Sequence, residues 1–384
     1  MIYLDANATT PMLPEVVEAM LPWLRDGFAN PSGTYAAAKL ARHAIEHARA
    51  QVASLIGADP TEIVFTSGGT ESVCTALHSL GVLAGQGHAL LSAIEHSAVL
   101  HGVQGLAREV RHAPVTAGGR LDLTLFADML DGAAFVSIMT ANNETGVIQP
   151  LAEAVELAHQ RGLPIHSDAV QAVGKIPVDV RKSGVDMLSL SAHKFHGPKG
   201  VGALYVRHGL RFEPLLHGGG QESGRRGGTE NTAAIVGMGA AAAAALEHLT
   251  SSAAAGTLRD AFEAQILATI TGVTVNGDVS HRLPNTSHLS FEQCAAAGLL
   301  ILLDEAGVAC AAGAACLTGN PQPSHVQLAM GIPAARAHTS LRCSFSRLTT
   351  LAETQAAAAA VRVAVTKLRR VQGAGVGPVV VYSP

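Results

Sequence analysis

The sequence predicts an α/β enzyme, with a mostly parallel sheet in one domain and a second, smaller α/β domain after it. Between residues 60 and 207, short β-rich runs alternate with segments of helical length, which is the pattern of strands joined by helical crossovers. Aromatic residues make up only 4% of the chain and 40 residues are glycine, a composition that suits closely packed helices and backbone-lined loops. Past residue 250 this alternation ends, and a helix to about residue 270 precedes two short strand-like runs.

Six short, β-rich runs define the strands expected in the first domain. They cover residues 62–66, 88–93, 134–140, 163–166, 185–191 and 201–206. Helices are expected over residues 14–23, 36–56 and 151–161, where apolar residues return every three or four positions. In the second domain we expect strands at 273–275 and 287–291, with a loop between them.

Charge and apolar content exclude several classes of protein. Hydrophobic residues form 48% of the 384, enough for a sizeable core, and 26 basic against 30 acidic residues leave a net charge of -4 without long runs of one sign. This balance argues against a nucleic-acid surface and against a polybasic membrane patch. We expect no secretory signal at the N-terminus, and the apolar stretch 233–246 is too short and too rich in alanine and glycine to predict a membrane span.

The five cysteines indicate reduced thiols and a cytoplasmic protein, because they form an odd set without the spacing of a disulfide framework. They are Cys74, Cys294, Cys310, Cys316 and Cys343. Only Cys310 and Cys316 lie close together in the sequence, and no second pair accompanies them. A structural zinc ion normally has four ligands, so we predict no metal site.

A turn between a strand and a helix offers a site for a phosphate group. The letters Thr-Ser-Gly-Gly-Thr at 66–70 follow an apolar strand and precede a helix-like stretch. Glycines such as Gly69 let backbone N–H groups approach an anion, the helix dipole favours negative charge there, and Thr70 adds a hydroxyl donor. The same kind of turn also occurs as a plain helix entry, so this interpretation needs support from other residues.

Two further polar residues follow apolar strands in the same domain. Asp168 comes directly after a strand, where open α/β sheets bind ligands, although capping a helix is its alternative role. Lys194 follows the next strand, and Lys199 is its rival for a cofactor. Ser191 and His193 favour Lys194, because they place further phosphate donors beside it. A lysine for a Schiff base, a carboxylate for a pyridinium nitrogen and a phosphate cradle together predict a pyridoxal phosphate site.

Motifs spread along nearly the whole chain carry a resemblance to one enzyme family. They are Tyr-Leu-Asp-Ala-Asn-Ala-Thr-Thr-Pro at 3–11, Thr-Ser-Gly-Gly-Thr-Glu-Ser at 66–72, Glu-His at 95–96, Asn-Asn-Glu-Thr-Gly at 142–146, His-Ser-Asp-Ala-Val-Gln at 166–171, Ser-Ala-His-Lys at 191–194, Arg-Arg-Gly-Gly-Thr at 225–229 and Gly-Ala-Ala-Cys at 313–316. With them the sequence resembles the cysteine desulfurases, which form part of the class V aminotransferase-like enzymes of pyridoxal phosphate fold type I.

The resemblance implies the fold in more detail. A large domain, residues 14–249, is expected to bind pyridoxal 5'-phosphate on a mostly parallel seven-stranded sheet. Residues 1–13 and 250–384 are expected to form a smaller α/β domain that carries a cysteine loop at about 311–324. The resemblance also implies a homodimer, because Thr229 is similar to the residue that reaches the phosphate of the neighbouring subunit's cofactor.

Residue by residue, the resemblance implies a set of cofactor contacts. Lys194 forms the Schiff base, Asp168 pairs with the pyridine nitrogen, and Gln171 donates to the ring oxygen of the cofactor. His96 stacks on the ring and handles thiol protons. The remaining contacts to the cofactor are assigned to Gly69, Thr70, Ser191, His193 and Asn143, of which Asn143 also helps to bind the substrate.

Cys316 is similar to the family's persulfide cysteine, and Arg342 to its carboxylate-binding arginine. The segment 311–324 is rich in Gly, Ala, Asn and Pro, which is typical of a mobile loop, whereas a small buried hydrophobe is the alternative role for Cys316. In the strand-like run 341–345 apolar and polar side chains alternate. Cys343 is therefore expected in the core, and Arg342 is expected to point to a polar site.

The resemblance predicts a cysteine desulfurase, which converts L-cysteine to L-alanine and passes the sulfur, held as a persulfide on Cys316, to an acceptor protein for iron–sulfur cluster or other sulfur-transfer pathways. The alternatives are a selenocysteine lyase or another carbon–sulfur lyase, a class V aminotransferase that needs no Cys316, and a non-catalytic scaffold. The joint presence of the lysine, the carboxylate, the arginine and the cysteine weighs against the scaffold. The extra thiol of Cys310 leaves the choice of reactive cysteine open.

Overall fold

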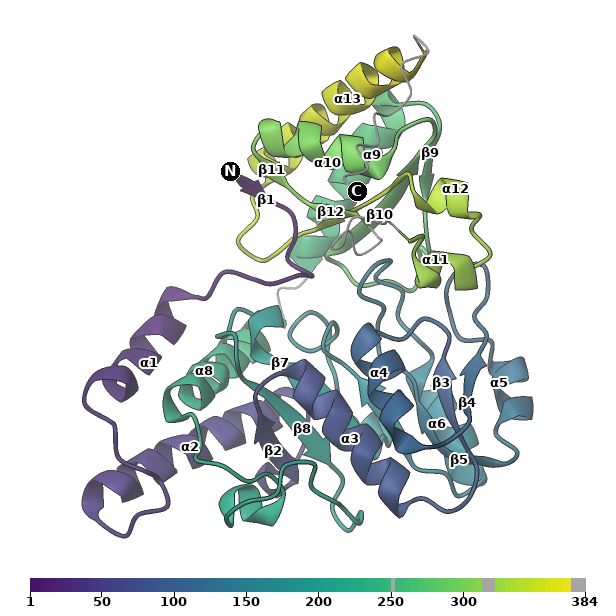
Figure 1. The fold of residues 1–384 in the computed structure, drawn as a ribbon. Coiled ribbons are helices and arrows are strands. Elements are labelled where there is room, and N and C mark those ends of the chain that lie inside the picture. Colours follow the sequence, from purple (N-terminus) through teal and green to yellow (C-terminus); the bar gives the residue numbers. More distant parts are fainter. Residues whose placement is uncertain (250–252, 313–321, 374–384) are drawn as a thin grey trace, which may run out of the picture.

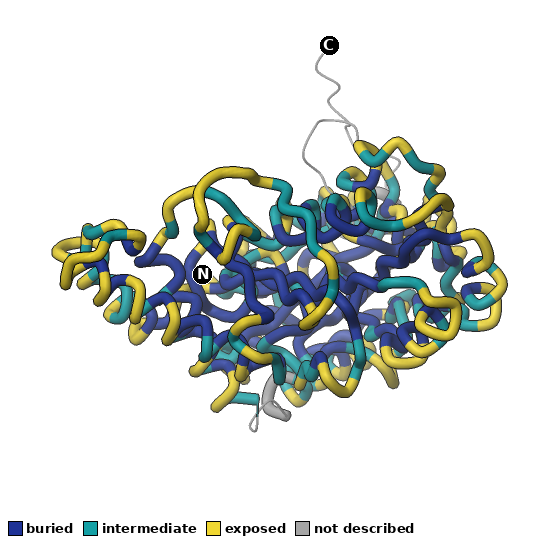
Figure 2. Tube along the Cα trace, turned by 90° about the horizontal axis from the view of Figure 1, so that it is seen from below, coloured by how far each residue is buried: buried dark blue, intermediate teal, exposed yellow. Residues whose placement is uncertain are grey.

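Two unequal parts, each with its own sheet, organise the computed structural model, which describes residues 1–249, 253–312 and 322–373. Figure 1 shows the larger part below and the smaller part above, with the N-terminal segment running between them. Buried chain fills the middle of the molecule, and exposed segments lie at its periphery (Figure 2). The α/β fold with a large and a small part that the sequence predicts is therefore confirmed.

The larger part is built on a seven-stranded sheet in the order β2-β8-β7-β6-β5-β3-β4. Its strands are β2 (Ile63–Thr66), β3 (His88–Ser92), β4 (Val110–Ala113), β5 (Ala133–Ser137), β6 (Ile165–Asp168), β7 (Met187–Ser191) and β8 (Gly202–Val206). β8 runs antiparallel to both of its neighbours, and every other pair is parallel. All strands except β8 therefore point the same way, and their carboxyl ends lie at one edge of the sheet.

Helices cover both faces of this sheet, and the strand side chains alternate between two cores. They are α1 (Pro14–Arg25), α2 (Ala36–Leu55), α3 (Gly69–Leu83), α4 (Ser97–Gly102), α5 (Leu123–Met129), α6 (Leu151–Gln160), α7 (Val180–Ser183) and α8 (Thr232–Leu249). Leu91 packs in the core under α3 and α4, whereas its neighbour Leu90 packs in the core under α2, α6 and α8. This is the two-residue period of a strand whose two faces are both buried.

α8 is the one helix among the described residues that is long and apolar enough to cross a membrane. Its 18 residues extend beyond the stretch 233–246 that the sequence singled out. Over half of it, 56%, is buried inside the molecule, and it packs against α1 and α2. A Cβ added at Gly239 would lie 2.6 Å from the Cα of Ala48, so glycine allows α8 and α2 to approach closely. This burial is typical of a core helix.

The smaller part holds a four-stranded antiparallel sheet in the order β12-β13-β10-β9, beside a parallel pair of β1 and β11. Its strands are β1 (Ile2–Tyr3), β9 (Val273–Val275), β10 (Thr286–Phe291), β11 (Val308–Ala309), β12 (Ala311–Ala312) and β13 (Ser340–Ser344). Its helices are α9 (Ala253–Thr269), α10 (Ala296–Glu305), α11 (His325–Ala329), α12 (Ala334–Ala337) and α13 (Leu351–Gly373). The rings of Phe262 and Phe345 meet edge to face in the core, with centroids 5.6 Å apart.

The opening segment joins the two parts. Leu4 N donates to Ala309 O at 2.8 Å, and Ser344 N donates to Leu4 O at 2.8 Å, so the chain begins within the smaller part. A few residues later, Thr10 N donates to His193 O at 2.9 Å in the larger part. The sequence alone left open where the opening residues pack, and the structure places their start on the smaller sheet.

Candidate active site

A cavity of about 260 Å³ opens at the carboxyl ends of the large sheet's strands. Both parts of the molecule line it, because Arg342 comes from β13 of the smaller part, and Asn7 and Ala8 come from the opening segment. The lining includes most of the residues that the sequence predicts for the site: Gly69, Thr70, His96, Asn143, Asp168, Gln171, Ser191, His193, Lys194 and Arg342. Residues separated by more than 270 positions in the sequence therefore meet in one cavity.

The phosphate cradle predicted at 66–70 is the entry to α3. No side chain among the described residues caps this helix, so the N–H groups of its first turn are available to an anion. A Cβ added at Gly69 would lie 2.8 Å from Val170 Cγ2, so only glycine lets the turn pack this close to the end of β6. His193 completes this side, and its Nδ1 lies 3.1 Å from Thr9 Oγ1. Burial, followed by the nearby lysine charges, lowers the pKa of His193 to about 4, so its ring is neutral at pH 7.

Lys194 lies just beyond β7 with its amine turned to the opening segment. Its Nζ donates to Asn7 O at 2.6 Å and to Ala8 O at 2.8 Å. Burial, followed by the positive charge of Arg342, lowers the pKa of Lys194 to about 8. A nucleophilic amine is therefore far more abundant near neutral pH than at an exposed lysine. The rival, Lys199, lines an adjoining hollow and not this cavity.

Asp168 and His96 are ionisable residues that both line the cavity, Asp168 buried and His96 partly exposed. Asp168 Oδ1 accepts from Val170 N at 2.9 Å, so this carboxylate makes the local backbone contact of a cap and also lines the cavity. Burial raises the pKa of Asp168, while the charges of His96 and Lys194 oppose the rise. Such a carboxylate gains most from a cationic partner, because burial has removed its solvation.

His96 caps α4, and its tautomer follows from that contact. Its Nδ1 accepts from Ala98 N at 3.1 Å, and burial lowers the pKa of the ring. The neutral ring therefore carries its proton on Nε2, which makes Nε2 a hydrogen-bond donor. The predicted acceptance of a thiol proton would require the contact to Ala98 to break, so this arrangement favours donation towards a sulfur atom instead.

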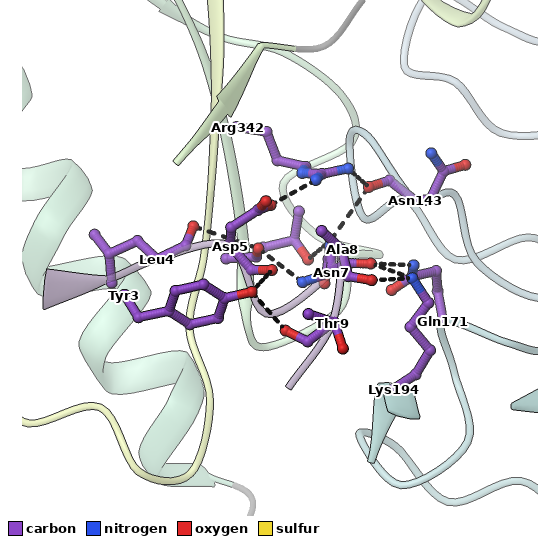
Figure 3. Close-up of polar contacts among 12 residues, drawn as sticks. Tyr3, Leu4, Asp5, Asn7, Ala8, Thr9, Asn143, Gln171, Lys194 and Arg342 are labelled. Carbon is purple, nitrogen blue, oxygen red and sulfur yellow. Dashed lines mark hydrogen bonds and ion pairs between the residues drawn. The ribbon is translucent and has the colours of Figure 1, made fainter. Parts of the chain in front are cut away.

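Arg342 is held by two contacts at the boundary between the parts (Figure 3). Its Nη2 donates to Asp5 Oδ1 at 2.7 Å, and its Nη1 donates to the backbone carbonyl of Asn143 at 2.9 Å. Its Nε is buried and has no hydrogen-bond partner among the described residues. On the opposite face of β13, Leu341 and Cys343 are buried in the core of the smaller part, as the alternating pattern predicts.

Two residues of the site escaped the sequence analysis. They are Asn7 and Lys175. Asn7 accepts hydrogen bonds from the amines of Lys194 and Lys175, and Lys175 also donates to Gln171. Figure 3 shows the carbonyl groups of Asn7 and Ala8 facing Lys194 and Gln171. The signal available for Lys175 was its position in the sequence, four residues after Gln171.

Two predicted site residues are not among the described residues that line the cavity. Thr229 is exposed and lines a separate hollow with Ser67 and Gly200. Cys316 lies outside the described residues, as do positions 313–321 of the expected cysteine loop. The cavity itself can hold an anion at the start of α3, a carbonyl carbon at the Lys194 amine, a ring nitrogen at Asp168 and a second carboxylate at Arg342.

Comparisons with known proteins agree with this geometry. The family model described as aminotransferase class-V matches residues 2–356. The curated "Cysteine desulfurase NifS" of Azotobacter vinelandii is 46% identical over 387 residues, covering 98% of this chain and 96% of that protein. A "Cysteine desulfurase" of Enterobacter agglomerans is also 46% identical, over 91% of this chain and 88% of that protein.

Solved structures extend the similarity to three dimensions. A structure titled "NIFS-LIKE PROTEIN" superposes with a TM-score of 0.87 at 34% identity, covering 97% of this chain and 99% of the other. A second, titled "SspA in complex with cysteine", superposes with a TM-score of 0.80 at 36% identity, covering 90% of this chain and 99% of the other. The chain therefore belongs to the class V aminotransferase family, in the branch that contains the cysteine desulfurases.

Proposed function

We propose that this protein is a cysteine desulfurase, which converts L-cysteine to L-alanine and takes up the sulfur on Cys316 as a persulfide. The observation that carries the proposal is the meeting of Lys194, Asp168, the uncapped start of α3 and Arg342 around one cavity. The names and the 46% identity of the curated relatives support the same activity.

The residues of the cavity fit pyridoxal 5'-phosphate. Gly69, Thr70, Ser191 and His193 would hold its phosphate, because they surround the anion-binding entry to α3. Lys194 would bond to its aldehyde carbon, Asp168 would contact the ring nitrogen, and Gln171, His96 and Asn143 would contact the ring. When bound, the cofactor supplies an electron sink for the negative charge that develops at the substrate's Cα.

Arg342 would bind the carboxylate of L-cysteine. Arg342 lines the cavity, each of its two Nη groups has a second N–H for a ligand, and Asp5 and Asn143 fix the plane of the guanidinium group. A fixed fork of this kind suits a planar carboxylate. Lys194, freed from the cofactor by the incoming amino group, would take the proton from Cα at its Nζ, for which a pKa of about 8 is well suited.

The flanks of the cysteine segment lie close to this substrate position, which supports a role for Cys316. On one side, Ala311 pairs with Arg342 across the β12–β13 ladder. On the other side, Ser324 Oγ donates to Glu144 Oε2 at 2.5 Å, next to Asn143. The described flanks of this segment therefore lie beside the carboxylate site, and we propose that the Cys316 thiolate attacks the substrate sulfur, with His96 Nε2 as the donor that stabilises the charge on sulfur.

The wider setting follows from the same proposal. We infer a homodimer, because Thr229 is exposed, lies outside this cavity and is similar to the residue that reaches the phosphate of the neighbouring subunit's cofactor. We infer a domain of residues 14–249 and another of 1–13 with 250–384, an acceptor protein that carries a thiol, and service to iron–sulfur cluster or other sulfur-transfer pathways. Four cysteines of the described residues are free thiols, which agrees with a cytoplasmic location.

The decisive experiment measures the products. The purified protein is supplied with pyridoxal 5'-phosphate, L-cysteine and dithiothreitol, and sulfide, alanine and pyruvate are quantified. We expect sulfide and alanine in equal amounts. Pyruvate with sulfide would identify a carbon–sulfur lyase, and a keto acid without sulfide would identify an aminotransferase. If L-selenocysteine, supplied in a parallel assay, is turned over and L-cysteine is not, the protein is a selenocysteine lyase. Absence of any cofactor absorbance would support the scaffold alternative.

A further inference from the structure

Lys175 is a half-buried lysine beside the cavity that the proposed mechanism does not use. Its Nζ donates to Gln171 Oε1 at 2.6 Å and to Asn7 Oδ1 at 2.8 Å, both neutral amide oxygens. Burial, followed by the charges of Lys194 and Arg342, holds the pKa of Lys175 well below its usual range. The two contacts do not depend on the charge, because a neutral amine still has two N–H donors.

Lys175 settles which way the Gln171 amide points. Gln171 Nε2 donates to the backbone carbonyl of Asn7 at 2.9 Å, while its Oε1 accepts from Lys175. Turning the amide over would set Oε1 against the Asn7 carbonyl, so two acceptors would face each other, and the Lys175 N–H would lose its acceptor on Gln171. Nε2 donates one N–H to Asn7, and its second N–H therefore stays available to the cavity that Gln171 lines.

Asn7 is fixed by the same amine. Its Oδ1 accepts from Lys175 and from Asn285 Nδ2 at 3.1 Å, and its Nδ2 donates to Thr286 Oγ1 at 3.0 Å and to the Asn143 carbonyl at 3.2 Å. Its backbone carbonyl accepts from Lys194 and from Gln171. Every polar atom of the side chain is engaged, so Asn7 ties the catalytic amine to both parts of the molecule.

We propose that Lys175 is a positioning residue, which locks the Gln171 amide so that its N–H faces the ring oxygen of the bound cofactor. The proposal rests on the proposed function, since it assumes the cofactor and its contact with Gln171. An N–H donor to the ring oxygen stabilises negative charge there and so favours loss of the proton from the adjacent nitrogen of Lys194. Without Lys175 the amide is free to turn over, and this effect is lost.

The test follows the cofactor's visible absorption band as a function of pH in the intact holoenzyme, before any substrate is added. We expect Lys175→Met to raise the pKa of the band shift by about one unit, which is the usual size for loss of one such contact. It should also weaken binding of pyridoxal 5'-phosphate by about tenfold. Lys175→Arg, which keeps two or more donors, should restore both values, and Lys182→Met, at an exposed lysine, should change neither.

A double-mutant cycle separates positioning from a structural role. If Lys175 acts through Gln171, then Lys175→Met should shift the band no further in a Gln171→Ala background. An unchanged titration in Lys175→Met, or additive shifts in the double variant, would overturn the proposal. The melting temperature of the cofactor-free protein reports folding separately. If Lys175→Met does not fold, the same pH titration of the visible band is carried out on Lys175→Gln, whose side chain is one atom shorter and uncharged. Wild-type protein that binds no cofactor would refute the proposed function itself.

Discussion

Asp5 Oδ1 lies 2.7 Å from Arg342 Nη2, an ion pair between the start of the chain and its last strand. The pair is mostly shielded from water, since the side chains are 22% and 10% exposed. Asp5 therefore uses one N–H of the guanidinium group, and Nε has no partner in the part of the chain that the structure describes. The arrangement holds a cation in a fixed plane in the cavity that Lys194 also lines.

Arg342→Lys tests this geometry, because it keeps the charge and removes the fork. An ammonium group has three N–H donors on one atom, so it cannot present the planar fork of two parallel N–H groups that a carboxylate fits. We expect kcat/KM for L-cysteine to fall by about tenfold or more, with a smaller change in kcat, since the carboxylate is bound in both ground and transition states. Steady-state kinetics checks this, and an unchanged kcat/KM would show that another residue binds the carboxylate.

Lys194→Ala should abolish turnover and the visible band of the bound cofactor, because no other lysine lines the cavity. Lys199→Ala is the matched control, since Lys199 lies only in the adjoining hollow. Absorption spectra of both variants after reconstitution are compared. Loss of the band in Lys199→Ala with its retention in Lys194→Ala would reverse the assignment.

The lowered pKa of Lys194 predicts a pH dependence of cofactor capture. Only the neutral amine attacks an aldehyde, so the capture rate of the cofactor-free protein should rise about tenfold per pH unit below the pKa and level off near pH 8. Stopped-flow absorbance gives this rate, and free Nα-acetyl-lysine, measured in parallel, corrects for ionisation of the cofactor. A rate that still climbs between pH 9 and 10 would mean an ordinary lysine.

Asp168→Asn should retain cofactor but lose about a hundredfold or more in kcat, because a neutral amide cannot hold a proton on the ring nitrogen. The amide keeps the shape of the side chain and its contact with Val170 N, so the fold should be conserved. Cofactor content by absorbance and kcat by sulfide release are measured on the same sample. Turnover at the wild-type rate would leave Asp168 with a capping role alone.

Cys316→Ser separates the desulfurase from its alternatives. This variant should bind L-cysteine but release no sulfide and carry no persulfide, whereas Cys310→Ser should stay active. Mass spectrometry of peptides digested without reductant, after brief incubation with L-cysteine, locates the extra sulfur. Extra sulfur on Cys310, or alanine formed with no modified cysteine, would contradict the assignment of Cys316 as the persulfide cysteine.

Strand-end residues could be predicted from the sequence, because their position depends on local pattern. Asp168 and Lys194 each follow an apolar run, and the parallel sheet brings such ends to one edge whatever the connecting loops do. β4 escaped prediction for the opposite reason. Only its last residue is buried, so Val-Arg-His-Ala gives no apolar signal at all.

Asn7 and Lys175 could not be assigned roles from sequence, since their partners are distant in the chain. Asn7 meets Lys194 and Thr286, at separations of 187 and 279 residues, and no local pattern encodes such contacts. Arg342 was predictable because its strand alternates, but its partner Asp5 was not. Sequence patterns thus located the catalytic groups, and only the structure identified what holds them.

The opening segment also sets the order in which the enzyme can mature on the ribosome. Asp5 is made 337 residues before its partner Arg342. At about 5–20 residues per second, Asp5 waits roughly 20 to 70 seconds for this ion pair. The contacts of Asn7 and Ala8 with Lys194 span only 187 and 186 residues, so they can form earlier. Cofactor capture during synthesis would thus precede assembly of the substrate's carboxylate pocket.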